Sequence, residues 1–112
     1  VTVNCDRLLL TQALENIVDN AVRFAPVDSA VTLTVAVTAA KVEVLVHDDG
    51  PGVPAEEQAR IFEPFFRGST PGSQTGLGLA FVAAVARQHG GHAMLVPTTS
   101  GTTIGFSIPR VR

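Results

Sequence analysis

The sequence predicts an α+β fold: a two-layer α/β sandwich in which helices pack on one face of a mixed, mostly antiparallel sheet. Two stretches repeat apolar residues at helical spacing, namely 8–24 and 80–89. Four stretches have the alternating or continuous apolar pattern of strands, namely 31–38, 42–48, 92–96 and 103–108. Only a short turn separates the first two strands, so we expect them to form an antiparallel hairpin.

Length and composition predict one domain over residues 1–112. We expect this domain to be a fragment of a longer protein, because the chain begins with Val1 rather than Met. The net charge of −2, with no basic stripe, gives no reason to expect a nucleic-acid partner. The single Cys5 excludes an internal disulfide and a cysteine-based zinc site, and it fits a reducing, cytoplasmic environment. No stretch is long enough to span a membrane and no signal peptide is visible, so the fragment itself is expected to be soluble and monomeric.

The first helix has clear end signals. Residues Val1-Thr2-Val3 before it are predicted to form a short edge strand, and Asn4 or Asp6 can cap the helix. The helix is expected to end at Ala25-Pro26, because the residue before a proline avoids the helical conformation.

The polar side of this helix carries an unusual stripe. Asn16, Asn20 and Arg23 are spaced four and then three residues apart, so they share one face. Such a stripe is either a solvated surface or a site for a metal–phosphate group. Amide oxygens are hard ligands for Mg²⁺, and a guanidinium group complements phosphate.

The strand at 42–48 ends in an acid that is followed by two glycines. Because side chains alternate along a strand, Asp48 lies on the same face as the valines and points toward the core. A buried unpaired charge is costly, so Asp48 needs a partner inside the protein or a ligand that brings a hydrogen-bond donor. Gly50 and Gly52 let the backbone approach another group closely. These features predict the floor of a ligand pocket.

The middle of the chain combines a short helix, a phenylalanine cluster and a polar loop. The helix is expected from Val53 to about Ile61, with Pro54 in its first turn. The segment 61–67 then has three of the six phenylalanines within five positions, which indicates either a core anchor or a patch that faces a partner. Residues 68–75 have no apolar anchor and are expected to be mobile.

Gly76-Leu77-Gly78 at the start of the second helix is a candidate phosphate cradle, because bare amides and the helix dipole favour anions there. It is neither a dinucleotide fingerprint nor a P-loop, since the required glycine and lysine spacings are missing. The histidines at 47, 89 and 92 have no metal-ligand spacing, and we expect them to be structural or exposed.

Taken together, these motifs resemble the ATP-binding catalytic domain of a bacterial two-component sensor histidine kinase, from the superfamily shared with gyrase and the MutL-type mismatch-repair ATPases. The resemblance covers about 3–109. Its motifs occur in the family's order: an N box at Asn16–Phe24, a first glycine box at Asp48–Gly52, an F box at Phe62–Arg67, a second glycine box at Thr75–Leu79 and a late element at Gly101-Thr102-Thr103. It implies a Bergerat-type sandwich with an ATP lid at about 67–76.

The resemblance also implies roles for individual residues. For the metal and phosphates it implies that Asn20 binds Mg²⁺, that Asn16 lies near the phosphates or the waters of the metal, and that Arg23 contacts phosphate. For the base it implies that Phe24 lies against the adenine and that Asp48 accepts a hydrogen bond from the adenine amine. Further implied roles are close approach to the base by Gly50 and Gly52, a water-mediated contact near the acid by Thr103, phosphate binding by Gly76, Leu77 and Gly78, and charge stabilisation during transfer, or contact with the partner domain, by Arg67.

The chain departs from the family pattern at several positions. Asp49 stands where asparagine is common and adds a negative charge at the pocket mouth. Gln74 and Thr102 each stand where glycine is frequent, and the loop at 68–75 is short for an ATP lid. None of these changes removes a principal ligand, so we expect an active kinase domain.

The implied activity is transfer of the γ-phosphoryl group of Mg²⁺-ATP to a histidine on the kinase's own dimerisation domain, with relay to an aspartate of a response regulator. The implied location is the cytoplasmic side of a membrane-anchored receptor. No histidine-bearing dimerisation helix is present in the sequence, so the isolated fragment is expected to bind nucleotide without phosphorylating itself. Two alternatives are an anti-sigma-type serine kinase of the same superfamily and a non-catalytic, nucleotide-responsive interaction module.

Overall fold

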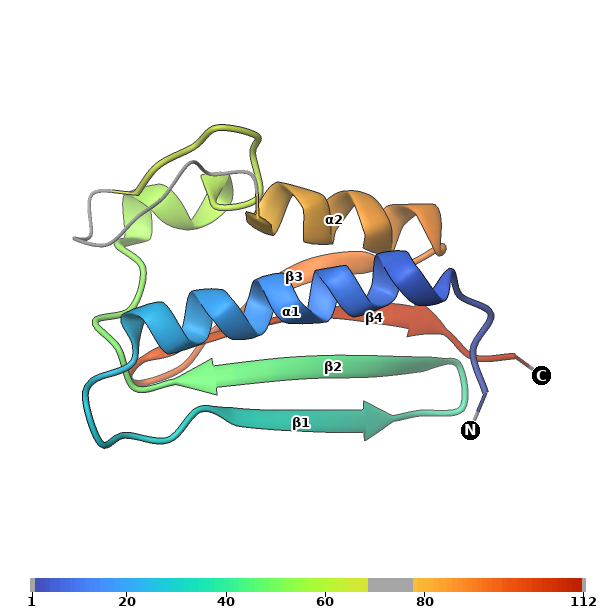
Figure 1. Ribbon diagram of the computed structural model, residues 1–112, viewed down its shortest axis with the longest axis horizontal. Coiled ribbons are helices and arrows are strands. Elements are labelled where there is room, and N and C mark those ends of the chain that lie inside the picture. The colour runs from blue at the N-terminus through green and yellow to red at the C-terminus, as the bar shows by residue number, and fades with distance from the viewer. Residues whose placement is uncertain (1, 69–77, 112) are drawn as a thin grey trace.

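Four strands form one sheet, and two helices cover one of its faces (Figure 1). The computed structural model describes residues 2–68 and 78–111. The helices are α1 (Arg7–Phe24), the 3₁₀ helix η1 (Ala55–Arg60) and α2 (Gly78–Gln88). The strands are β1 (Thr32–Val37), β2 (Lys41–Asp48), β3 (His92–Val96) and β4 (Thr102–Pro109), in the spatial order β1-β2-β4-β3. This arrangement confirms the predicted two-layer α+β sandwich, although every strand pair among the described residues is antiparallel rather than mixed.

Helix α1 begins and ends where its sequence signals predict. The Asp6 side chain accepts a hydrogen bond from the Leu9 amide at 3.1 Å, so Asp6 rather than Asn4 is the cap. The helix ends at Phe24, just before Ala25-Pro26. Its inner face is small and apolar, with Ala13, Ile17 and Ala21 all at most 3% exposed. This narrow face lets α1 pack closely on the sheet.

The core lies between the two helices and the inner face of the sheet. Strand alternation places Val46 and Asp48 on that face, where they are 1% and 2% exposed, as the sequence pattern predicts. Phe106 on the central strand β4 is the largest fully buried side chain. The other buried apolar residues around it are Ala13, Ile17, Ala21, Val82, Val85, Ala86, Ile104 and Ile108.

Strand β1 is more exposed than its alternating pattern predicts. Leu33, Val35 and Val37 pair with the inward-facing valines of β2, yet they are 50%, 55% and 46% exposed. The reason is that α1 packs on β2 and β4, while α2 packs on β3 and β4, so the edge strand lies beyond the two helices.

The predicted edge strand at Val1-Thr2-Val3 is wrong for the described residues 2 and 3, which are not in a strand. Among residues 2–68 and 78–111, one backbone hydrogen bond, from the Val111 amide to the Thr2 carbonyl at 2.8 Å, joins this segment to the end of the chain. One such bond does not make a ladder, and the chain turns away to start α1.

The expected short helix is a 3₁₀ helix. It begins after Pro54, whose carbonyl accepts a hydrogen bond from the Glu57 amide at 2.9 Å, three residues on. Only six residues are helical, and so short a segment commonly adopts this tighter form.

The phenylalanine cluster divides between buried and exposed positions. Phe62 packs against the core, and Phe66 is half-buried. Phe65 is 72% exposed and adopts a positive φ of 65°, which is rare for a bulky side chain. The predicted mobile lid falls largely on residues 69–77, which lie outside the described residues. No helix in the described part of the chain is long and apolar enough to cross a membrane.

Candidate functional site

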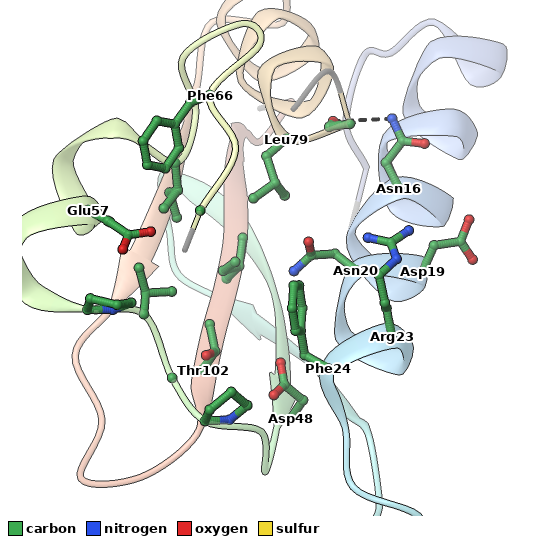
Figure 2. A pocket seen from close by; sticks show the side chains of 18 residues that line it. Asn16, Asp19, Asn20, Arg23, Phe24, Asp48, Glu57, Phe66, Leu79 and Thr102 are labelled. Carbon is green, nitrogen blue, oxygen red and sulfur yellow. Dashed lines mark hydrogen bonds between the residues drawn. The ribbon is translucent and has the colours of Figure 1, made fainter. Parts of the chain in front are cut away.

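A cavity of about 270 Å³ opens between α1, the end of β2, η1 and the start of α2 (Figure 2). Its walls include most of the predicted site residues that the structure describes. These are Asn16, Asn20, Arg23, Phe24, Asp48, Gly52 and Gly78. The structure therefore brings together residues that are up to 62 positions apart in the chain.

Helix α1 supplies one wall of the cavity. Figure 2 shows Asn16, Asn20 and Arg23 in a row along this helix, with Phe24 below them. The Asn16 amide nitrogen donates to the Gly78 carbonyl at 3.2 Å, and its oxygen accepts from the Gln12 side chain at 2.7 Å. Asn16 thus joins α1 to the first turn of α2. Among the described residues, the side chains of Asn20 and Arg23 have no hydrogen-bond partner, so they are available to a ligand.

Asp48 lies at the floor of the cavity. It is 2% exposed, and its Oδ1 accepts a hydrogen bond from the Gly50 amide at 2.8 Å. Burial raises the pKa of the Asp48 carboxyl above its usual value, and the nearby Asp49 raises it further. The Gly50 amide and the neighbouring His47 lower this pKa in part. A buried carboxyl that faces a cavity is a strong acceptor for an N–H donor of a ligand.

Gly50 and Gly52 differ in their relation to the cavity. Gly52 lines it and has a φ of 80°, a conformation that glycine adopts without strain. Gly50 is not among the lining residues. A Cβ at Gly50 would lie 2.6 Å from the Phe24 carbonyl oxygen and 2.7 Å from Asp48 Oδ1. The structure therefore explains Gly50 by close packing of the turn against the end of α1, and its approach to a base stays a prediction.

The prediction for Thr103 needs a correction. In the β2–β4 ladder Asp48 is opposite Thr102, and it is Thr102 that lines the cavity. Thr103 is opposite His47, and its side chain bonds that histidine on the other face of the sheet. Because successive side chains alternate in a strand, moving by one residue changes the face. Thr102 is therefore the threonine beside the buried acid.

The remaining predicted residues lie at or beyond the border of the described cavity. Arg67 is exposed and is not among the lining residues, whereas its neighbours Phe66 and Gly68 are. Gly76 and Leu77, and the departure at Gln74, lie outside the described residues. The structure therefore tests the position of Gly78 but not that of the rest of the predicted cradle.

Several lining residues were not predicted to belong to the site. They are Asp19, Pro51, Val53, Pro54, Glu57, Ile61, Phe66, Gly68, Leu79, Thr102 and Ile104. Asp19 is adjacent to Asn20, and Leu79 follows Gly78. Both could have been predicted as lining residues from these neighbours in the sequence. Phe66 had a signal in the F box, whereas Ile61 and Ile104 are brought to the site only by the tertiary fold.

The two ends of the cavity differ in chemistry. One end combines the Phe24 ring with the carboxyl of Asp48, which suits a flat ring that carries an N–H donor. The other end has the amide of Asn20, the guanidinium of Arg23 and the first turn of α2, which suits an anion. Residues 2–68 and 78–111 contain no cluster of three or more His, Cys, Asp or Glu side chains that could hold a metal ion. A metal at this end would rely on amide oxygens and on oxygens of the ligand.

A family model described as "Histidine kinase-, DNA gyrase B-, and HSP90-like ATPase" matches residues 5–112. The sensor-like histidine kinase SenX3 of Mycobacterium tuberculosis is 42% identical over 107 residues, which cover 92% of this chain and 26% of SenX3. The chain spans about a quarter of the length of the curated relatives it matches.

Solved structures show the same architecture. The mycobacterial sensor histidine kinase MprB superposes with a TM-score of 0.86 at 31% identity, covering 96% of this chain and 76% of that structure. Full-length ShkA in complex with AMPPNP superposes with a TM-score of 0.77 at 34% identity, covering 93% of this chain and 22% of ShkA.

Proposed function

The chain belongs to the histidine kinase-, DNA gyrase B- and HSP90-like ATPase family, and from this premise we propose that it binds Mg²⁺-ATP and donates the γ-phosphoryl group to a histidine. The acceptor histidine lies on a separate dimerisation domain of a sensor histidine kinase, and the phosphoryl group passes on to an aspartate of a response regulator. One observation carries the proposal: a buried acid and an amide–guanidinium stripe line the same cavity.

The adenine end of the proposed site is built from Asp48, Thr102 and Phe24. The adenine amine donates to the Asp48 carboxyl, and the Phe24 ring lies against the base. Thr102 is directly opposite Asp48 in the ladder and is 9% exposed, so its hydroxyl is placed to assist the acid, directly or through a water.

The phosphate end is built from α1 and the start of α2. The Asn20 amide oxygen would hold Mg²⁺ and Arg23 would contact phosphate. Asn16 bonds the Gly78 carbonyl at the first turn of α2. In this proposal the backbone amides of Gly76 and Leu77, as well as Gly78, would bind phosphate. Mg²⁺ neutralises charge on the phosphates when it is bound.

The chain contributes mainly position and charge to the reaction, as is general for phosphoryl transfer. An imidazole nitrogen of the acceptor histidine forms a bond to the γ-phosphorus of ATP. The bond from that phosphorus to the oxygen that bridges the β- and γ-phosphates breaks, and ADP leaves with that oxygen. Arg23 and Arg67 stabilise negative charge during this step, and Arg67, being exposed, is also available to the partner domain.

We further propose that the domain lies on the cytoplasmic side of a membrane-anchored receptor.

The isolated chain is expected to bind ATP without phosphorylating itself. His47 lies in β2, His92 lies in β3, and His89 directly follows α2, so none projects from the middle of a described helix as the family's acceptor does. Incubation with radiolabelled ATP, followed by gel analysis at alkaline pH, measures the product. Stoichiometric labelling of the 112-residue chain would contradict this expectation.

Asn20→Ala is expected to reduce the Mg²⁺-dependent part of ATP binding. The loss of one amide ligand removes a contact to the metal but leaves the base site intact, so binding without Mg²⁺ should change little. Calorimetric titrations with ATP, with and without Mg²⁺, measure both parts. Gln88→Ala is a matched control, because this exposed amide also lies on a helix, α2, but does not line the cavity. Equal losses with and without metal would refute the assignment of Asn20 to Mg²⁺.

Phe65→Ala is expected to impair transfer to the dimerisation domain without weakening ATP binding. The side chain is 72% exposed in a strained backbone conformation and does not line the cavity, which fits docking to a histidine-bearing helix pair. Phosphotransfer in the full-length protein and ATP titration of the same variant give the two readouts. Normal transfer by the variant would contradict the docking role of Phe65. Absence of transfer to histidine by the unmodified protein would favour the serine-kinase or non-catalytic alternative, and phosphotransfer assays against histidine and serine acceptors then separate these two.

A further inference from the structure

Three polar side chains are joined on the face of the sheet that is turned away from the cavity. His47 Nδ1 lies 2.7 Å from Thr103 Oγ1, and His47 Nε2 lies 3.1 Å from Asp49 Oδ1. His47 and Thr103 are direct cross-strand partners in the β2–β4 ladder. The three residues therefore form one network that starts in β4, crosses β2 and reaches the turn after β2.

The proton positions in this network follow from its chemistry. The carboxylate of Asp49 can only accept, so His47 Nε2–H donates to it. In the neutral ring Nδ1 then has a lone pair, which accepts the hydroxyl proton of Thr103. Both ring nitrogens are thus engaged, and the ring orientation is set at both ends.

The network holds the chain on both sides of the acid at the cavity floor. His47 precedes Asp48 and Asp49 follows it. The hydrogen bond between the His47 ring and the Asp49 carboxylate therefore links the two residues that flank Asp48. On the opposite face, Asp48 is opposite Thr102 and both line the cavity. Strand β2 ends at Asp48, so the ladder alone does not restrain the turn that follows.

We propose that His47, acting with Asp49 and Thr103, is a positioning residue for base recognition. It fixes the backbone around Asp48 so that the carboxyl faces the cavity before the ligand arrives, which reduces the ordering cost of binding. This inference rests on the proposed function, since it assumes that Asp48 reads the adenine amine. It also explains Asp49, because a carboxylate at that position is matched by the imidazole beside it.

The chain offers a matched control at the other end of the same strand. His92 Nδ1 lies 3.3 Å from Ser107 Oγ, and these two residues are also cross-strand partners that involve β4. Ser107 is four residues along β4 from Thr103, which corresponds to roughly 13 Å. His92 does not line the cavity. His92→Ala therefore removes a comparable histidine–hydroxyl bond from the sheet without touching the turn.

The test is calorimetric titration with ATP of the unmodified chain and of His47→Ala, Asp49→Ala, the double variant, Asp49→Asn and His92→Ala. His47→Ala and Asp49→Ala are each expected to weaken ATP binding about threefold to tenfold, the effect of losing a typical hydrogen bond. The double variant should bind no more weakly than the weaker single variant, because residues that act as a unit are not additive. Asp49→Asn keeps an acceptor for Nε2–H and should restore near-normal affinity. His92→Ala should leave affinity unchanged.

Each outcome decides one question. If the unmodified chain does not bind ATP, the proposed function fails. If it binds ATP and His47→Ala binds equally well, only the positioning role fails. Equal weakening by His92→Ala, or additive losses in the double variant, would also overturn that role. Thermal unfolding of each variant verifies that it is folded, and Asp49→Ala, whose side chain is 56% exposed, provides the test if His47→Ala does not fold.

Discussion

Asp48→Asn is expected to weaken binding of ATP and of ADP by about tenfold to a hundredfold. The range corresponds to about 1.5–3 kcal/mol for a hydrogen bond to a charged group. The asparagine oxygen can still accept the Gly50 amide, so its NH₂ group would face the adenine amine, and two donors would then oppose each other. ATP and ADP should lose affinity equally, because in the proposed function the acid contacts the base and not the phosphates.

Nucleotide selectivity and stability give further readouts for Asp48→Asn. The preference for ATP over GTP should narrow, since the asparagine NH₂ can donate to the guanine carbonyl. Burial raises the pKa of Asp48, so the folded state favours the protonated carboxyl over the ionised one. The stability that this preference contributes is lost as pH rises through the raised pKa, where the buried carboxyl must ionise. Asparagine cannot ionise, so the ligand-free variant should be at least as stable as the unmodified chain near neutral pH.

The pH dependence of ATP binding is expected to have the opposite sign to that of folding stability. Because the amine donates to the carboxylate, affinity should fall as pH is lowered toward the raised pKa of Asp48. Calorimetry at several pH values measures it. Asp28→Asn is the control, since Asp28 is an exposed acid in the turn after α1. An equal loss in that control, or a loss for ATP but not for ADP, would contradict base recognition by Asp48.

Phe106→Ala is expected to lower the free energy of unfolding by about 3–5 kcal/mol, the usual cost of emptying a large core site. Phe106 is 2% exposed in the central strand β4, opposite Val44 of β2 and Ala93 of β3. It belongs to the same buried cluster as Ile17 on α1 and Val82 on α2. Its removal therefore affects both layers of the sandwich.

Urea unfolding of the isolated chain measures this loss as a lower midpoint with an unchanged slope. Phe65→Ala is the matched control, because the same atoms are removed from a side chain that is 72% exposed. Its effect on stability should be within about 0.5 kcal/mol. Similar losses in both variants would mean that Phe106 does not anchor the core.

The regular spacing of apolar residues predicted most helices and strands, because local backbone geometry sets that spacing. The apolar repeat of α1, the cap at Asp6 and the stop before Pro26 all depend on residues within a few positions of one another. The inward direction of Asp48 follows from strand alternation for the same reason. The stripe of Asn16, Asn20 and Arg23 was likewise predictable from the pitch of a helix.

Long-range register was not predictable in this way. The placement of Thr102 rather than Thr103 beside Asp48 depends on how β4 aligns with β2, and a shift of one residue reverses every side chain. The exposure of β1 depends on where the helices lie over the sheet. The 3₁₀ form of η1 and the division of the phenylalanine cluster depend on packing that local propensity does not specify.

By itself, the sequence determined the fold class, the acid that faces inward at the end of β2 and the amide–guanidinium stripe of α1, because each arises from backbone periods of a few residues. Only the tertiary structure decided which threonine accompanies Asp48, why Gly50 must pack against the end of α1, and that His47 joins Thr103 to Asp49. These contacts join residues that are distant in the chain or that lie beyond the end of a strand. Their geometry depends on strand register and on the packing of the two layers.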